Sequence, residues 1–386
     1  MERLEDKDIR IAIVCDWLTG MRGGERCVEA ACQLYPKADI FTLVHIPGSV
    51  SSHIELHNIY TSYIQKLPGR IDNFRKYLPL FPDAIKRVDL ENYDIILSFS
   101  HCVAKGVKHS SKVPHICYCF TPMRYAWEMR NEYLRRKGFP KRLLASIVLD
   151  YLKSWDYRTA SNVTQFIASS KYVQARIKNS YNRESEIIYP PVDCSRFSFS
   201  TDDSGYYLVL SALVPYKRID IAVEAFRDFD RELLILGSGP ELGYLKNKAG
   251  RNIHFLGDLN DAQVSQYLQK CTALIFPGLE DFGIVPLEAQ ACGKPVVAYG
   301  KGGATETVIP LNDNAGNTDA TGLFFNEQTP ESLRKAVVEF EERKDEISPQ
   351  SCRQNALRFD LPIFKEKLKN YILSVILSEG HTARRM

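Results

Sequence analysis

The sequence contains no long hydrophobic run. No stretch approaches the roughly 18 uninterrupted apolar residues that a membrane-spanning helix requires, and the opening residues MERLEDKDIR lack the apolar core of a secretory signal. The chain also has little net charge. Its value of +3 is too small to indicate a nucleic-acid partner. These absences predict a cytoplasmic protein that does not cross a membrane and does not bind nucleic acid.

Closely paired cysteines are absent as well. Ten cysteines are scattered along the chain, mostly inside apolar segments, and no two of them form a C-x-x-C pair. This pattern argues against a disulfide framework and against a zinc site. Cys117 and Cys119 alternate with Tyr118 on an expected strand, so both thiols should face the core. We therefore predict that the cysteines are buried and reduced.

Alternating strands and helices are what the chain does contain. Its 386 residues exceed one typical domain, and a composition of 45% hydrophobic and 25% charged residues is that of a globular protein. The regular alternation predicts an α/β architecture with parallel sheets and helices on both faces. The phrase IIYPPVDCSRF contains Pro190 and Pro191, which disfavour both helix and central strand. We expect a domain boundary at these prolines.

The first expected strand is followed by a glycine-containing loop. Residues 9–15 form an apolar strand, residues 16–24 (DWLTGMRGG) form a loop, and a helix is expected to begin near Glu25. In a doubly wound domain such a loop lies at the ligand-binding edge of the sheet. Gly23 and Gly24 end this loop, and taken alone a glycine pair before a helix makes an ordinary tight turn. The spacing is not the G-x-G-x-x-G of dinucleotide enzymes, which weighs against hydride transfer.

Two carboxylates follow a buried strand in the second half of the chain. The strand is expected at Ala273–Phe276, a loop at Pro277–Phe282 and a helix at Val285–Cys292. Glu280 lies in the loop, and Glu288 lies eight residues later in the early turns of the helix. Because a carboxylate accepts hydrogen bonds from two vicinal hydroxyls, Glu288 suits a ribose and Glu280 suits a sugar.

The start of the same helix suits an anion. Gly283 lets the backbone approach a ligand, and the unpaired N–H groups of a helix start favour phosphate. One nucleotide-sugar would span this helix start and both glutamates. The alternative is that Glu280 is an ordinary loop acid and that Glu288 is a helix N-terminal acid that satisfies the helix dipole.

The surrounding residues resemble a known family. The arrangement F-P-x-x-E-D-F-G-I-x-P-L-E-A-x-A-C-G-K-P-V-V-A resembles the E-x7-E motif of the retaining glycosyltransferases with the GT-B fold (glycosyltransferase group 1). This resemblance implies an α/β GT-B fold, in which two doubly wound Rossmann-like domains face a cleft. Residues 1–192 would bind the acceptor and residues 193–360 the nucleotide-sugar. Residues 361–386 would form a helix that returns to the first domain.

Donor-side residues follow from the same resemblance. Lys217 and Arg218 lie just before a helix, where two cations would neutralise a diphosphate leaving group, unless they are simply an exposed pair. With Glu280 they are the expected catalytic residues. Ala212 stands where the family has an arginine, and Gly302 and Gly303 lie in a loop that faces the nucleotide in the family. The expected donor-binding residues are Glu288, Phe282, Gly283, Ile284, Val285, Gly257 and Gly237.

The acceptor side follows another expected strand. The phrase Y-C-x-T-P-M-R-Y-x-W (residues 118–127) resembles a subgroup associated with surface polysaccharides, often mannosyltransferases. The expected acceptor or phosphate contacts are Phe120, Thr121 and Arg124, together with the two glycines of the first loop. The subgroup usually has a histidine at position 120, which hydrogen-bonds the donor sugar. Phe120 can stack on a sugar but cannot donate that bond, which puts the family's catalytic detail in doubt here.

Two basic runs offer a second kind of contact. Residues Tyr60–Arg87 interleave basic and aromatic side chains, and Arg130–Arg142 adds basic residues next to an amphipathic helix. Such runs suit an anionic membrane surface or are solvated helix faces. Peripheral attachment at the inner face of the membrane, through the first domain, is therefore a hypothesis.

The resemblance implies hexosyl transfer with retention of configuration. The expected donor is GDP-mannose, and the expected acceptor is a glycan or a polyprenyl-linked sugar in polysaccharide assembly. We expect no cofactor and no metal, since the D-x-D of Asp228 and Asp230 falls between a helix and the next strand, where a surface turn is usual. The alternatives are a UDP-sugar donor or a nucleotide-sugar binding protein that has lost catalysis. A sugar-nucleotide epimerase would need acid/base motifs that the sequence does not show.

Overall fold

The chain forms two compact units. The structure, a computed structural model, describes residues 9–69, 73–135, 138–312 and 319–382. One unit contains residues 1–189 together with the final helix from Phe364, and the other contains residues 190–363. We call them the N-terminal unit and the C-terminal unit. The chain passes from one to the other between Tyr189 and Pro190.

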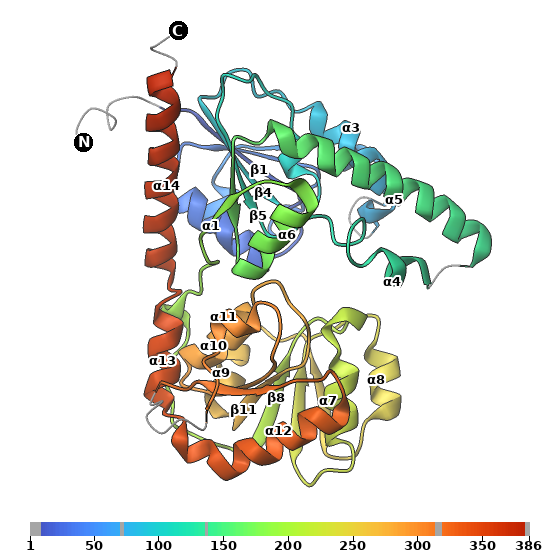
Figure 1. The fold of residues 1–386 in the computed structure, drawn as a ribbon, viewed down its shortest axis with the longest axis vertical. Coiled ribbons are helices and arrows are strands. Elements are labelled where there is room, and N and C mark those ends of the chain that lie inside the picture. Colours follow the sequence, from blue (N-terminus) through green and yellow to red (C-terminus); the bar gives the residue numbers. More distant parts are fainter. Residues whose placement is uncertain (1–8, 70–72, 136–137, 313–318, 383–386) are drawn as a thin grey trace. The chain divides into compact units, whose positions relative to one another are not determined.

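The N-terminal unit is built on a seven-stranded parallel sheet (Figure 1). The strand order is β3-β2-β1-β4-β5-β6-β7. All residues of β1, β4 and β5 are buried, because helices cover both faces of a doubly wound parallel sheet. The strands are β1 (Ile11–Cys15), β2 (Asp39–Thr42), β3 (Ile59–Thr61), β4 (Ile95–Ser100), β5 (His115–Cys119), β6 (Gln165–Ala168) and β7 (Ser185–Ile187).

Seven α-helices complete this unit in the described part of the chain. They are α1 (Gly23–Leu34), α2 (Ser52–Glu55), α3 (Phe81–Lys86), α4 (Arg130–Arg135), α5 (Phe139–Thr159), α6 (Lys171–Tyr181) and α14 (Leu361–Thr382). No helix in the described ranges is both long enough and apolar enough to span a membrane. Helix α14 packs on the first sheet, where the Phe364 ring lies 5.8 Å from the Tyr118 ring.

Two features of this unit differ from expectation. Helix α1 begins at Gly23 rather than near Glu25, so the predicted loop ends two residues earlier, at Arg22, and both glycines belong to the first turn of the helix. The Glu25 side chain explains the early start, because it accepts a hydrogen bond from the backbone N–H of Arg22 (3.1 Å) and satisfies that group at the helix end. Strands β3 and β7 were not expected, since three residues are too few to show a hydrophobic period.

A buried ion pair holds α5 against the sheet. The Lys105 ammonium lies 2.7 Å from Oδ1 of Asp156, and the two side chains are 2% and 0% exposed. Nζ of Lys105 also donates to the carbonyl oxygen of Asp156 and to the Thr159 hydroxyl. The indole N–H of Trp127 and the hydroxyl of Tyr181 donate to the other Asp156 oxygen. The charge of Asp156 is therefore compensated by groups from several elements, as burial of a carboxylate requires.

The C-terminal unit repeats the plan with six parallel strands in the order β10-β9-β8-β11-β12-β13. The strands are β8 (Tyr206–Leu210), β9 (Glu232–Leu236), β10 (Ile253–Gly257), β11 (Ala273–Phe276), β12 (Val296–Tyr299) and β13 (Gly322–Phe325). The helices are α7 (Ile219–Phe226), α8 (Leu242–Lys248), α9 (Asp261–Lys270), α10 (Ile284–Ala291), α11 (Ala304–Thr307), α12 (Pro330–Arg343) and α13 (Pro349–Leu357). Two doubly wound Rossmann-like sheets were predicted, and both are present.

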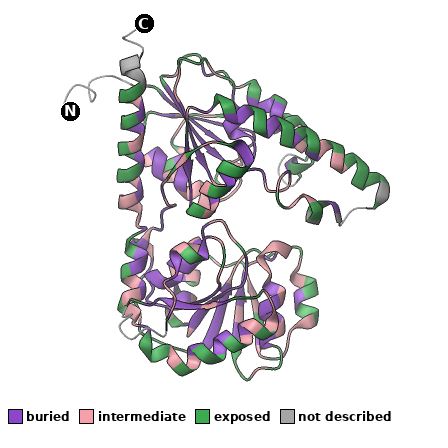
Figure 2. Ribbon diagram, in the orientation of Figure 1, coloured by how far each residue is buried: buried purple, intermediate pink, exposed green. Residues whose placement is uncertain are grey.

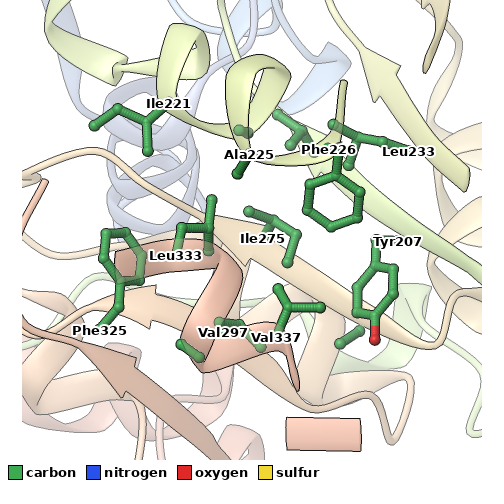
Figure 3. Packing of buried hydrophobic residues seen from close by; sticks show 14 of the residues in the cluster. Tyr207, Ile221, Ala225, Phe226, Leu233, Ile275, Val297, Phe325, Leu333 and Val337 are labelled. Carbon is green, nitrogen blue, oxygen red and sulfur yellow. The ribbon is translucent and has the colours of Figure 1, made fainter. Parts of the chain in front are cut away.

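Apolar side chains from α7 and α12 pack on one face of this second sheet. Figure 3 shows Phe226 of α7 beside Tyr207 of β8, and Val337 of α12 near Val297 of β12. The rings of Tyr207 and Phe226 meet edge to face, with centroids 5.2 Å apart. In both units the sheets lie at the centre of the buried residues (Figure 2). All ten cysteines are buried, which confirms the predicted burial of the thiols.

We predict that Lys105→Met destabilises the N-terminal unit. Removal of one partner leaves Asp156 as a buried charge without its cation, which costs about 3–5 kcal/mol in comparable pairs. Urea denaturation measures the free energy of unfolding. Lys112→Met, at an exposed loop position, is the matched control and should stay within about 0.5 kcal/mol of wild type. Equal stability of the two variants would contradict the proposed role of the ion pair.

Candidate functional site

Each sheet has one topological switch point, where successive strands stop adding to one side of the sheet and start adding to the other. In the N-terminal unit the order turns between β1 and β4, and in the C-terminal unit it turns between β8 and β11. Ligands of open α/β sheets bind outside the carboxyl ends of the strands at such a switch point. The loops that leave β1 and β4, and those that leave β8 and β11, are therefore the candidate ligand sites.

Lys217 and Glu280 meet at the switch point of the C-terminal unit. Lys217 ends a short 3₁₀ helix after β8, and Glu280 lies in the loop after β11. Nζ of Lys217 lies 2.5 Å from Oε2 of Glu280, and the side chains are 17% and 18% exposed. Arg218 instead contacts Asp220, with Nε 3.1 Å from Oδ1. The structure thus brings together two of the three predicted catalytic residues and places the third beside a residue of its own helix.

A glycine loop after β12 supports Glu280. The backbone N–H of Gly303 donates to the Glu280 carbonyl oxygen at 2.8 Å. A Cβ atom on Gly303 would lie 2.2 Å from Cα of Phe282, and one on Gly302 would lie 2.6 Å from the Glu280 carbonyl oxygen. Only glycine permits this approach, because real Cβ atoms do not come so close to backbone. The two loops therefore position each other.

Helix α10 carries the other predicted donor-binding residues. Gly283 is the N-cap residue in a left-handed conformation (φ 95°) and offers no side chain to cap the helix start. Phe282 is buried with its ring 5.7 Å from that of Phe359. Ile284 and Val285 form the first turn and are half-buried. The sequence motif therefore becomes a helix start whose backbone N–H groups point away from the helix at the carboxyl edge of the sheet.

A buried polar network connects α10 to α11 and α13. Nδ2 of Asn355 donates to Oε1 of Gln290 at 2.6 Å and to the carbonyl oxygen of Thr307 at 2.9 Å. Nε2 of Gln290 donates to the same carbonyl oxygen. Glu288 lies two residues before Gln290 and is half-buried. Sequence reasoning missed this network, because a glutamine and an asparagine 65 residues apart carry no local signal.

The remaining predicted donor residues lie on the outer strands of the same sheet. Gly237 follows β9 and Gly257 ends β10. The Gly237 N–H donates to the Gly257 carbonyl oxygen at 2.8 Å. Ala212 follows β8, so it too lies at the carboxyl edge. These residues therefore share the sheet edge of Lys217.

An acidic residue that the sequence analysis did not identify organises the N-terminal switch point. Asp16 directly follows β1 and is 2% exposed. Its two carboxylate oxygens accept hydrogen bonds from the backbone N–H groups of the four consecutive residues 101–104, at 2.6–2.9 Å. Nδ1 of His101 lies 3.1 Å from Oδ2 of Asp16. The Asp-Trp pair after the first strand was the available signal.

The predicted acceptor residues are partly brought together. A Cβ atom on Gly24 would lie 3.3 Å from the Phe120 ring, so this ring packs on the first turn of α1. Thr121 is buried, and its hydroxyl donates to the Pro122 carbonyl oxygen at 3.1 Å. Arg124 is half-buried further along the loop. Gly23 begins α1 beside Gly24.

The local charges at this edge include Glu25. Burial raises the pKa of the Glu25 carboxyl, and its backbone hydrogen bonds together with the nearby Arg22 guanidinium partly offset that rise. In the predicted D-x-D, Asp228 pairs with Arg227. Within the described ranges no three His, Cys, Asp or Glu side chains are grouped to hold a metal ion. Metal independence stays a prediction.

Comparison with known families covers both units. The sequence model described as "Glycosyl transferases group 1" matches residues 195–359, and the model "Glycosyltransferase Family 4" matches residues 21–196. The chain belongs to the group 1 glycosyltransferases. The match includes the pair of Lys217 and Glu280, so the C-terminal switch point lies in the group 1 domain.

Individual relatives of this group 1 chain match more locally. It is 28% identical to an uncharacterized glycosyltransferase of Methanocaldococcus jannaschii, over 46% of this chain and 50% of that protein. It is 30% identical to the GDP-mannose-dependent monoacylated alpha-(1-6)-phosphatidylinositol monomannoside mannosyltransferase of Corynebacterium glutamicum, over 44% of this chain and 51% of that protein. The chain thus spans about half the length of these curated relatives.

A solved structure supports the fold over the whole chain. HepE of Anabaena, crystallised in complex with UDP, superposes with a TM-score of 0.69 at 17% identity and covers 95% of this chain and 100% of that chain. The fold is therefore the predicted two-domain α/β GT-B fold.

We predict that Gly303→Ala destabilises the C-terminal unit. The added methyl group overlaps the Phe282 backbone, and relief of such overpacking typically costs about 1–3 kcal/mol. Gly243→Ala is the matched control, since a Cβ there meets no atom within 4 Å. Urea denaturation of both variants compares their free energies of unfolding. Similar values would show that the two loops do not depend on each other.

Proposed function

We propose that the chain transfers a hexose, with mannose from GDP-mannose as the preferred case, onto a lipid-linked or oligosaccharide acceptor. The observation that carries the proposal is the ion pair of Lys217 and Glu280 at the switch point of a group 1 domain. A cation and a carboxylate at that position match the two chemical demands of a nucleotide-sugar, whose diphosphate is anionic and whose hexose offers hydroxyl groups.

The proposed mechanism starts with exchange of that ion pair. A bound diphosphate competes with Glu280 for the Lys217 ammonium, because phosphate oxygens carry the greater negative charge. The released Glu280 carboxylate then accepts hydrogen bonds from vicinal hydroxyls of the hexose. Lys217 stabilises the charge that builds up on the leaving nucleoside diphosphate. Arg218 would have to leave Asp220 to join it.

The start of α10 supplies the second source of positive potential. Its first N–H groups follow Gly283, and the helix dipole favours an anion at that end. Glu288 would hold the ribose, while the backbone at Phe282, Gly283, Ile284 and Val285 would face the donor. The N-terminal unit, with Phe120, Thr121 and Arg124, would bind the acceptor.

Retention of configuration is part of the proposal. No side chain of this site is identified as a covalent nucleophile, so we favour a front-side displacement. In that step the acceptor oxygen forms the new bond to the anomeric carbon while the bond to the diphosphate breaks on the same side. The acceptor proton moves to a donor phosphate oxygen. No metal is needed for this scheme, since Lys217 and α10 provide the compensating charge.

The proposal admits more than one nucleotide-sugar donor. The name of the Corynebacterium glutamicum relative specifies GDP-mannose, whereas HepE of Anabaena was crystallised with UDP. A UDP-sugar donor is therefore the second candidate. A protein that binds a nucleotide-sugar without turnover is the third, because Phe120 and Ala212 depart from the family pattern.

We predict that Glu280→Gln and Lys217→Met each reduce sugar transfer by about 100- to 1,000-fold, the range seen when one group that stabilises developing charge is removed. Release of nucleoside diphosphate from GDP-mannose and from UDP-glucose is the measurement, with Glu339→Gln on the exposed face of α12 as control. Turnover of UDP-glucose alone would overturn the GDP-mannose assignment. Wild-type turnover in both site variants would overturn the site.

A second part of the proposal concerns membrane attachment. One face of α5 exposes apolar side chains, with relative exposures of 60% for Leu143, 66% for Leu144, 59% for Ile147 and 45% for Tyr151. These positions recur at helical spacing and lie on one side of the helix, whereas Leu152 on the other side is buried. Figure 2 shows α5 largely exposed along its length.

The charge around this face suits an anionic surface. The described exposed side chains of α5 include four cations, Lys141, Arg142, Lys153 and Arg158. The exposed acid of α5, Asp150, is paired with Arg130 of α4. Basic and apolar side chains on one helix are typical of helices that lie in a membrane interface. Three cations of the predicted basic runs, Arg70, Arg136 and Lys137, lie outside the described residues.

We predict that Leu144→Glu combined with Ile147→Glu abolishes binding to vesicles of phosphatidylglycerol and phosphatidylcholine. Each buried apolar side chain contributes about 1.5–3 kcal/mol, so the loss should exceed about tenfold in partition coefficient. Co-sedimentation is the measurement, and Leu357→Glu on α13, which is 40% exposed, is the control. Absence of wild-type binding to these vesicles would remove the hypothesis.

A further inference from the structure

His101 stands at the N-terminal switch point in a defined orientation. Its backbone N–H donates to Oδ2 of Asp16 at 2.7 Å, and Nδ1 of its ring lies 3.1 Å from the same oxygen. Asp16 is buried and accepts further hydrogen bonds from the next three backbone N–H groups. The carboxylate is therefore fixed, and its negative charge lies beside Nδ1 of the imidazole.

This contact determines which ring nitrogen is available. The negative Oδ2 of Asp16 beside Nδ1 favours the tautomer with its proton on Nδ1, so the neutral ring keeps a lone pair on Nε2. No partner for Nε2 is found among the residues that the structure describes, and the side chain is 37% exposed. Nε2 of His101 is thus an oriented hydrogen-bond acceptor at the ligand-binding edge of the sheet.

Aromatic side chains flank the imidazole. The Trp17 ring lies edge to face with it at 4.5 Å, and the Phe120 ring lies 6.4 Å away. Trp17 leaves β1, His101 leaves β4 and Phe120 leaves β5, which are three adjacent strands. Aromatic walls with a few oriented polar groups are typical of small-molecule sites. The apolar C–H faces of a sugar suit the rings, and its hydroxyls suit Nε2.

We propose that His101 contacts the sugar in the N-terminal unit, where its Nε2 accepts a hydrogen bond from a hexose hydroxyl. Asp16 is the positioning residue that fixes the tautomer. The inference rests on the proposed glycosyl transfer. It also accounts for Phe120, because an imidazole on the neighbouring strand end supplies a polar contact that a phenyl ring at position 120 lacks.

The test compares His101→Phe, His101→Gln and wild type. His101→Phe keeps a ring against Trp17 and leaves the backbone hydrogen bonds to Asp16 intact, whereas His101→Gln keeps a polar acceptor. We expect His101→Phe to lower kcat/KM by about 10- to 100-fold, as expected when a polar contact to substrate is lost, and His101→Gln to lose less. His53→Phe, at an exposed position of α2, is the control and should match wild type.

Two reactions locate the contact. Hydrolysis of GDP-mannose by water tests the donor hexose, and transfer to methyl α-mannoside tests an acceptor sugar, with UDP-glucose run in parallel. Thermal melting confirms that each variant is folded. A loss in either reaction supports the inference and names the sugar concerned. Wild-type kcat/KM in a folded His101→Phe variant overturns it and leaves the proposed function standing, whereas an inactive wild type on both donors removes the proposed function and the inference together.

Discussion

Parallel pairing of every strand is the constraint on which both candidate sites depend. In each sheet the carboxyl ends of the strands lie along one edge, and the strand order turns at β1 and β4 or at β8 and β11. Loops that leave neighbouring strands therefore meet although they are far apart in sequence. Lys217 meets Glu280 in one unit, and Asp16 meets His101 in the other. The same topology thus places a carboxylate beside a nitrogen-bearing side chain at each switch point.

The two pairs differ in how firmly their carboxylates are held. Asp16 accepts four backbone hydrogen bonds and is buried, so exchange of its partners would cost several hydrogen bonds at once. Glu280 holds a lysine ammonium at a half-buried position, where water or a ligand can replace either partner. The first carboxylate is therefore suited to fix a neighbouring side chain, and the second is suited to exchange its cation for contacts with a ligand.

The strands of the central sheets could be predicted from sequence, because their apolar runs are continuous and end at turn residues. Glu280 was predicted from a motif with a long, fixed spacing and Lys217 from its place before a helix, but their ion pair was not, because the two residues lie far apart in sequence. His101 was not predicted, because its neighbour Asp16 lies 85 residues away in the sequence. Asp16 binds backbone N–H groups, which nearly every residue type has, so the residues that it contacts leave no recognisable sequence pattern. Arg218 lies beside Asp220, two residues along, since local side-chain contacts compete with the expected phosphate clamp.

Phe120 departs from the family pattern, and its packing shows what that departure changes at the sheet edge. A histidine at that position would offer a polar group beside Gly24, yet the phenyl ring fills the space against the first turn of α1 and leaves no hydrogen-bonding group there. The loss is local to one strand end. His101 leaves the adjacent strand with Nδ1 of its ring beside a buried carboxylate, so the sheet edge keeps an imidazole. An aromatic residue at position 120 therefore changes the shape of this edge without removing its capacity to bind a hydroxyl group.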